Sequence, residues 1–180
     1  MGQMMHGSKD ATPLATRAIL LTVLAITVAT HLLLPAGWID PADSAQVALI
    51  LWLFTGLFVL RVVGQILVAL RPRAWLPPMV QWNFIPYPVL LPIQVIFVVV
   101  MVWINQSFFA RAGVMPVKQP GAGNYLIIFS ALYALAMLIR YGRRMLVHPD
   151  QRWFGGTIPI VFHLVLASYL YFIGRYHVSV

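Results

Sequence analysis

The sequence has no cysteine and no glutamate, and its only acidic residues are the aspartates Asp10, Asp40, Asp43 and Asp150. Without cysteine, the chain cannot form disulfides, thiolate nucleophiles or cysteine-ligated zinc and iron–sulfur sites. The four aspartates all lie outside the long hydrophobic runs. Because transporters coupled to protons or sodium usually carry a carboxylate at membrane depth, this absence argues against coupled transport.

Charged residues of either sign are scarce, at 9% of the 180 residues, whereas hydrophobic residues make up 61%. The mean hydropathy is +0.86. Soluble domains are about 45–50% apolar and about 25% charged, so the composition predicts an integral membrane protein. The formal net charge is +8, but the basic residues stand mostly at the ends of hydrophobic runs, as in membrane proteins. We therefore expect no nucleic-acid binding.

Five hydrophobic runs are long enough to cross a bilayer as helices, which takes about 20 residues each. The expected spans are 17–38, 44–70, 88–108, 124–147 and 153–176. Residues 1–16 are expected to form a polar tail, and residues 17–180 a single transmembrane domain. The sequence thus predicts an all-α bundle of five transmembrane helices.

A segment rich in proline and tryptophan, 75–92, precedes the third span. We expect it to lie along the membrane interface, where Trp and Tyr are enriched. The alternative is that it re-enters the membrane, which non-helical backbone can do only under cover of protein or water.

Basic residues also predict the orientation. With five spans and an inner N-terminus, Lys9, Arg17, Arg71, Arg73, Arg140, Arg143, Arg144 and Arg152 lie inside, whereas Arg111, Lys118 and Arg175 lie outside. Positive residues concentrate on the cytoplasmic side. We therefore expect a bacterial-type inner (cytoplasmic) membrane, with the N-terminus inside and the C-terminus outside.

The last run separates small and polar residues from bulky ones. At helical spacing, one side holds Gly156, His163, Ala167, Tyr171 and Gly174, and the rest holds Phe162, Val165, Leu166, Tyr169 and Phe172. Since small residues allow helices to approach closely, we expect the first side to face protein and the bulky side to face lipid.

His163 stands near the middle of this run and is a candidate axial ligand for haem or a chlorophyll-type pigment. The alternative is a structural histidine, hydrogen-bonded across helices to a serine, a tyrosine or a carbonyl. A b-type haem usually takes two histidines at matched depth, and His31 is the only other histidine well inside a span. Counted from the inner helix ends, the two differ by about 6 Å in depth.

Arg61 lies inside the second run, with Gln65 one helical turn later. A guanidinium at the membrane centre costs about 2.5–3.5 kcal/mol on insertion scales, and no acid of the chain lies at its depth. The Arg61 side chain can extend toward the inner headgroups, donate hydrogen bonds to carbonyls or tyrosine hydroxyls, or contact an anionic lipid, ligand or partner subunit. Arg61, Gln65 and Gln94 are therefore candidate contacts for a ligand or partner.

Four arginines near the end of the fourth span form a basic collar: Arg140, Arg143, Arg144 and Arg152. We expect the collar to bind anionic lipid headgroups. The alternative is an acidic cytoplasmic protein.

The sequence contains no metalloprotease, serine-hydrolase or phosphate-loop motif and no pair of carboxylates, so an enzyme is not favoured. The leading interpretation is a non-catalytic accessory subunit of a larger membrane complex, bound to other membrane subunits, in a bioenergetic system (respiratory, photosynthetic or integral-membrane oxidase). One alternative is a haem- or pigment-binding protein that uses His163. Another is a small transporter or lipid-binding protein with Arg61 facing an anionic ligand.

Overall fold

The computed structural model describes residues 12–71, 74–77, 87–109, 117–148 and 153–179. These residues form five α-helices and no strand: α1 (Leu14–Leu33), α2 (Ser44–Leu70), α3 (Tyr87–Phe109), α4 (Pro120–Val147) and α5 (Ile158–Val178). All five are long and apolar enough to cross a membrane. The predicted all-α class and the five apolar helices are thus confirmed, and the helices indicate a membrane location.

Several helix ends differ from the expected spans: α1 begins at Leu14, within the expected polar tail, α4 begins at Pro120, and the largest differences are at the end of α1 and the start of α5. α1 ends at Leu33, and the chain then turns through Gly37, whose φ of 76° suits glycine. α5 begins only at Ile158, because residues 153–156 form a turn in which Gly156 has a φ of 58°. α2 begins where expected, since the Asp43 carboxylate accepts hydrogen bonds from the first backbone N–H groups of that helix.

Most of the segment rich in proline and tryptophan lies outside the described residues. Residues 74–77 precede that gap, and α3 begins after it, at Tyr87. The Thr16 hydroxyl of α1 donates a hydrogen bond to the Trp75 carbonyl at 3.0 Å. The start of α1 and the chain just after α2 therefore meet at one end of the bundle.

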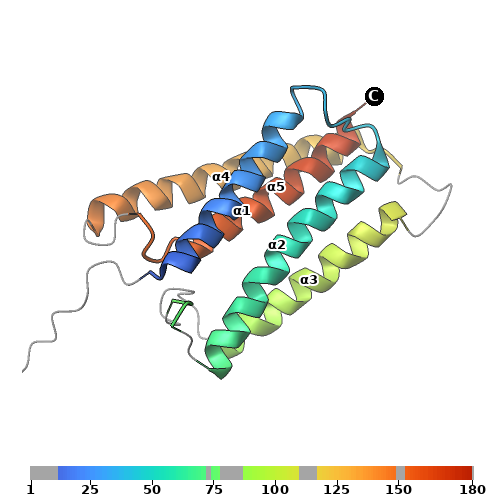
Figure 1. Ribbon diagram of the computed structural model, residues 1–180. Coiled ribbons are helices and arrows are strands. Elements are labelled where there is room, and N and C mark those ends of the chain that lie inside the picture. Colours follow the sequence, from blue (N-terminus) through green and yellow to red (C-terminus); the bar gives the residue numbers. More distant parts are fainter. Residues whose placement is uncertain (1–11, 72–73, 78–86, 110–116, 149–152, 180) are drawn as a thin grey trace, which may run out of the picture.

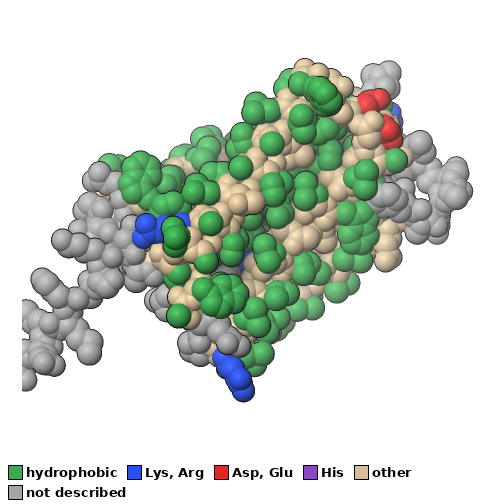
Figure 2. All heavy atoms as spheres, viewed as in Figure 1, with side chains coloured by type: hydrophobic (Ala, Val, Ile, Leu, Met, Phe, Trp, Pro, Cys, Tyr) green, Lys and Arg blue, Asp and Glu red, His purple; other side chains and the backbone are tan. Residues whose placement is uncertain are grey.

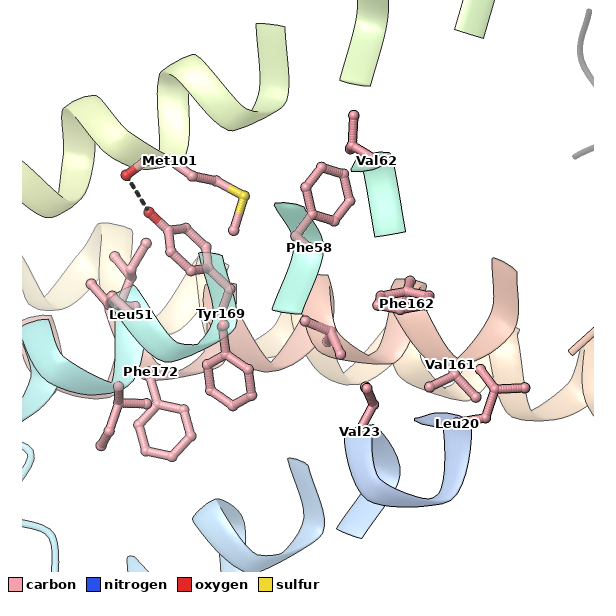
Figure 3. Packing of buried hydrophobic residues seen from close by; sticks show 14 of the residues in the cluster. Leu20, Val23, Leu51, Phe58, Val62, Met101, Val161, Phe162, Tyr169 and Phe172 are labelled. Atoms are coloured by element: carbon pink, nitrogen blue, oxygen red, sulfur yellow. Dashed lines mark hydrogen bonds between the residues drawn. The ribbon is translucent and has the colours of Figure 1, made fainter. Parts of the chain in front are cut away.

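α5 lies at the centre of the bundle (Figure 1). It packs against α4, α2 and α1, and α3 packs on α2. The hydrophobic core joins α1, α2, α3 and α5, as Figure 3 shows for Val23, Phe58, Met101 and Phe162. α5 is the most buried of the five helices, and α4 is the least buried.

The expectation that the bulky side of α5 faces lipid is wrong. Phe162, Val165, Tyr169 and Phe172 are all at most 3% exposed. The reason is that α5 has neighbours on more than one side. Its bulky residues pack into α1 and α2, where the rings of Phe54 and Phe172 lie 5.8 Å apart.

α3 and α4 are the least buried helices. Exposed apolar side chains on these helices include Ile96, Trp103, Leu132 and Leu135. Hydrophobic side chains cover much of the face shown in Figure 2, whereas acidic ones gather where α1 leads into α2. Such a surface suits lipid or an apolar partner.

Glycine brings α4 close to α5. A Cβ placed on Gly123 would lie 2.8 Å from the carbonyl oxygen of Gly174, and one on Gly174 would lie 2.9 Å from that of Gly123. Real Cβ atoms essentially never approach other atoms below 3.0 Å. The two helices therefore touch through their backbones, which is how small residues drive helix packing in membranes.

The substitution Gly123→Ala is expected to force α4 away from α5, because the new methyl group meets the backbone oxygen of Gly174 as well as side-chain atoms of His177 and Val178. We expect the free energy of unfolding to fall by about 1–3 kcal/mol. Thermal or denaturant unfolding of the purified protein in a mild detergent measures this change.

The matched control is Gly142→Ala on the same helix, where an added Cβ meets no atom within 4 Å. This variant is expected to leave stability unchanged or to raise it by up to about 1 kcal/mol through helix propensity. Equal losses in both variants would contradict close packing at Gly123.

Candidate functional site

α2 carries polar residues on the face that it buries. Thr55 is 2% exposed, Arg61 5% and Gln65 0%. The Cζ atom of Arg61 lies 6.0 Å from the centre of the Phe58 ring. Its Nε atom is buried, and none of the hydrogen bonds or ion pairs within the described ranges includes this side chain. Arg61 is thus a buried cation that the described protein does not neutralise.

Acidic residues in the described part of the chain lie far from Arg61. They are Asp40 and Asp43, in the turn between α1 and α2. Asp43 caps α2 18 residues before Arg61, a distance of about 27 Å along the helix axis. Neither carboxylate can therefore form an ion pair with Arg61, and an anion at this site must come from elsewhere.

A second set of polar residues is fully hydrogen-bonded and ties three helices together. The Asn105 amide of α3 donates to the Thr55 hydroxyl of α2 at 2.8 Å, and the Tyr169 hydroxyl of α5 donates to the Asn105 side-chain oxygen at 3.0 Å. Tyr169 also lies 3.2 Å from the Met101 carbonyl, the contact drawn in Figure 3. Because every polar atom in this set has a partner, we assign it to structure.

Gln94 of α3 differs from that satisfied set. It is 2% exposed, and both polar atoms of its amide are buried without a hydrogen-bond partner in the described part of the chain. An unsatisfied buried polar group costs about 1–3 kcal/mol. Such a group is expected to bind water or a ligand.

Gln65 and Gln94 lie at nearly the same level of the bundle. The bond between Thr55 and Asn105 fixes the register of the antiparallel pair α2 and α3. Ten residues further along α2, Gln65 then faces the neighbourhood of Gln94, one helical turn from Arg61. The three contact residues predicted from the sequence are thus all buried, and they belong to one stretch of the bundle.

A cavity of about 90 Å³ adjoins Arg61, between α1, α2 and α5. Its other lining residues include Thr16, Leu67, Trp75 and Phe162. Arg61 is the only charged residue that lines it, and the whole wall is almost entirely apolar, so the nitrogen atoms of Arg61 present almost no surface to the cavity. The cavity is large enough for several waters or a small anionic group.

His163 has a protein partner. Its Nδ1 atom and the Tyr133 hydroxyl of α4 share a hydrogen bond, and the two rings meet edge to face with centroids 5.6 Å apart. This is the arrangement expected for a histidine bonded across helices, and it leaves Nε2 as the nitrogen that could bind a further group. Tyr133 and His163 thus link α4 to α5.

The structure does not bring His31 and His163 together. The His31 ring stacks on Tyr171, with centroids 5.2 Å apart, and its Nδ1 donates to the Thr27 carbonyl at 2.9 Å. Tyr171 lies eight residues beyond His163 on α5, so the two histidines differ in depth by about 12 Å. That is twice the offset expected from the sequence. Haem or pigment binding at either histidine stays a prediction.

The collar arginines separate into different environments. Arg143 is exposed, whereas Arg140 and Arg144 are half-buried on α4. Arg152 lies outside the described residues. Among the residues that are described, no three His, Cys, Asp or Glu side chains form a group that could hold a metal ion.

Comparisons with protein-family models, with curated proteins and with solved structures found no match for this chain. Sequence reasoning selected Arg61, Gln65 and Gln94, but it missed Tyr133 as the partner of His163. Only the register between α4 and α5 identifies that tyrosine.

Proposed function

We propose that the protein binds a small anionic ligand within the membrane-spanning part of its bundle, as a small transporter or lipid-handling protein. The observation that carries this proposal is Arg61, which is 5% exposed and forms no ion pair or hydrogen bond with described residues. An uncompensated cation at membrane depth is costly. A bound anion offsets that cost through charge-assisted hydrogen bonds to the guanidinium.

Burial favours a small ligand over an acid on a neighbouring subunit. A partner helix packs against exposed surface, and Arg61 presents almost none. The cavity of about 90 Å³ beside Arg61 has an almost entirely apolar wall, but its volume suffices for a carboxylate or phosphate group next to this residue. Gln94, about one turn away, has amide atoms without partners among the described residues and adds hydrogen-bonding capacity at similar depth.

The chemistry of the chain also favours binding or uncoupled transfer over coupled transport. None of the hydrophobic runs contains an acidic residue. Coupling to protons or sodium generally uses carboxylates at membrane depth. We therefore expect the protein either to bind the ligand without moving it or to let the ligand cross the membrane down its own concentration gradient.

The substitution Arg61→Met tests this site, because methionine keeps much of the volume and removes the charge. We expect an anion such as octanoate or inorganic phosphate to raise the unfolding midpoint of the wild-type protein in a neutral detergent. At a concentration 100 times Kd, the stabilisation is about 2.7 kcal/mol. Arg61→Met should lose that response and keep or gain stability without ligand, since a desolvated charge is gone.

The matched control is Arg71→Met, at the exposed end of the same helix, which should respond to the anion like the wild type. Arg61→Lys should keep part of the response. The proposal is wrong if neither anion stabilises the wild type, or if Arg61→Met responds as strongly as the wild type does.

A second candidate function is the non-catalytic subunit of a larger membrane complex. The observation in its favour is that α4 packs chiefly on α5 alone and leaves a stripe of apolar side chains exposed, including Ile128, Leu132 and Leu135. A partner helix could cover that stripe, although lipid would cover it equally well.

Extraction in a mild native detergent separates these candidates by particle size, composition and visible spectrum. A ligand-binding protein should run as a small colourless particle that contains only this chain. A large particle with partners in fixed proportion would instead establish a subunit. A small coloured particle whose colour is lost in His163→Ala would establish a haem or pigment ligand.

We also infer an inner N-terminus in a bacterial-type inner membrane. Arg17, Arg71 and Arg144 stand at the helix ends that meet at one end of the bundle, whereas Lys118 and Arg175 belong to the other. This asymmetry supports an orientation with the first end toward the cytoplasm.

Because the chain has no cysteine, one introduced at exposed Val147 or exposed Val117 reports orientation directly. In intact cells, a membrane-impermeant thiol reagent should label Val117→Cys and spare Val147→Cys. The reverse pattern would overturn the orientation. Equal labelling of both variants after the membrane is opened is the control.

A further inference from the structure

A second hollow, of about 220 Å³, lies between α1 and α4, with α5 as its floor. Its walls include Leu21 and Leu24 of α1, Leu138 of α4 and Leu164 of α5. We call it the α1–α4 groove. Its surface is almost entirely apolar. The hydroxyl groups of Tyr141 and Thr157 both donate hydrogen bonds to the Trp153 carbonyl, so their polarity is already satisfied. The groove therefore suits a hydrocarbon chain.

Two arginines stand at one end of this groove. Phe154 lines the groove, and the Cζ atom of Arg17 lies 5.3 Å from the centre of its ring. The guanidinium of Arg144 lies over Gly156, two residues further along the turn. A Cβ placed on Gly156 would clash with the Arg144 guanidinium. The groove thus has an apolar body and a cationic end.

These arginines also stand at the level expected for lipid headgroups. Arg17 is in the first turn of α1, and Arg144 is in the last turn of α4. Arg17 is held in place by a hydrogen bond from its Nε atom to the Thr12 carbonyl at 3.0 Å, just ahead of α1. Paired arginines beside an apolar groove match an amphiphile with one anionic end.

We propose that the α1–α4 groove binds an anionic phospholipid from the leaflet beside the turn between α4 and α5. An acyl chain lies along Leu21, Leu24 and Leu138, and the phosphate lies between Arg17 and Arg144. This goes beyond the collar expected from the sequence, because it selects Arg144 from that collar and adds Arg17. It is also independent of the site at Arg61, which belongs to the smaller cavity.

Native mass spectrometry of the purified chain in detergent tests the proposal, with phosphatidylglycerol and phosphatidylcholine of identical acyl chains as probes. The wild type should retain more phosphatidylglycerol than phosphatidylcholine. Arg17→Gln and Arg144→Gln should each reduce that preference roughly fivefold, the effect of about one surface charge. Arg144→Lys should retain part of the preference.

Two matched controls locate the lipid. Arg143→Gln removes an exposed charge from the same helical turn and should leave the preference unchanged. Leu24→Trp fills the groove and should weaken retention of both lipids, whereas Leu32→Trp, on exposed surface outside the groove, should not. Unfolding midpoints near that of the wild type verify that the variants are folded.

The proposal is overturned if Arg143→Gln weakens the preference as much as Arg144→Gln does, since the effect would then be diffuse surface charge. It is also overturned if Leu24→Trp retains both lipids like the wild type. Neither result would bear on the anion response at Arg61, so failures of the two sites can be told apart.

Discussion

The packing of α5 against neighbours on several sides is the constraint on which the rest of the bundle depends. One side meets the α4 backbone at Gly123 and Gly174, and the bulky side fills the core with α1 and α2. A helix enclosed in this way can hold polar side chains, because neighbours supply their partners. Tyr169 reaches Asn105, and His163 reaches Tyr133. Both contacts require the central position of α5, and both fix the register of its neighbours.

Buried polar groups in this bundle divide into two kinds, and the division separates structure from candidate function. Thr55, Asn105 and Tyr169 satisfy one another, which stabilises the three helices that carry them. Arg61 and Gln94 are equally buried but have polar atoms with no partner within the described part of the protein. Burying such groups destabilises the folded state unless a ligand or water binds them. This contrast within one membrane-spanning region carries the proposed function.

Much of the fold was predictable from sequence, because hydrophobic length and scarce charge define membrane helices almost directly. The beginning of α5 was not, since the turn ahead of it is apolar and depends on the positive φ of Gly156. The bulky face of α5 was misassigned because the pattern of one helix does not reveal how many neighbours surround it. The burial of Arg61 and Gln94 was foreseeable from their positions in apolar runs. The partner of His163 was not, because it depends on how α4 and α5 are aligned.

Depth distinguishes the two proposed anion sites. Arg61 lies nine residues before the end of α2, about 14 Å along the helix axis. Arg17 and Arg144 lie at helix ends, where phosphates of the surrounding leaflet are found. A phospholipid held by these two arginines therefore cannot place the same phosphate on Arg61. The separation of Arg61 from these helix ends along the bundle favours a separate small ligand for the site at Arg61.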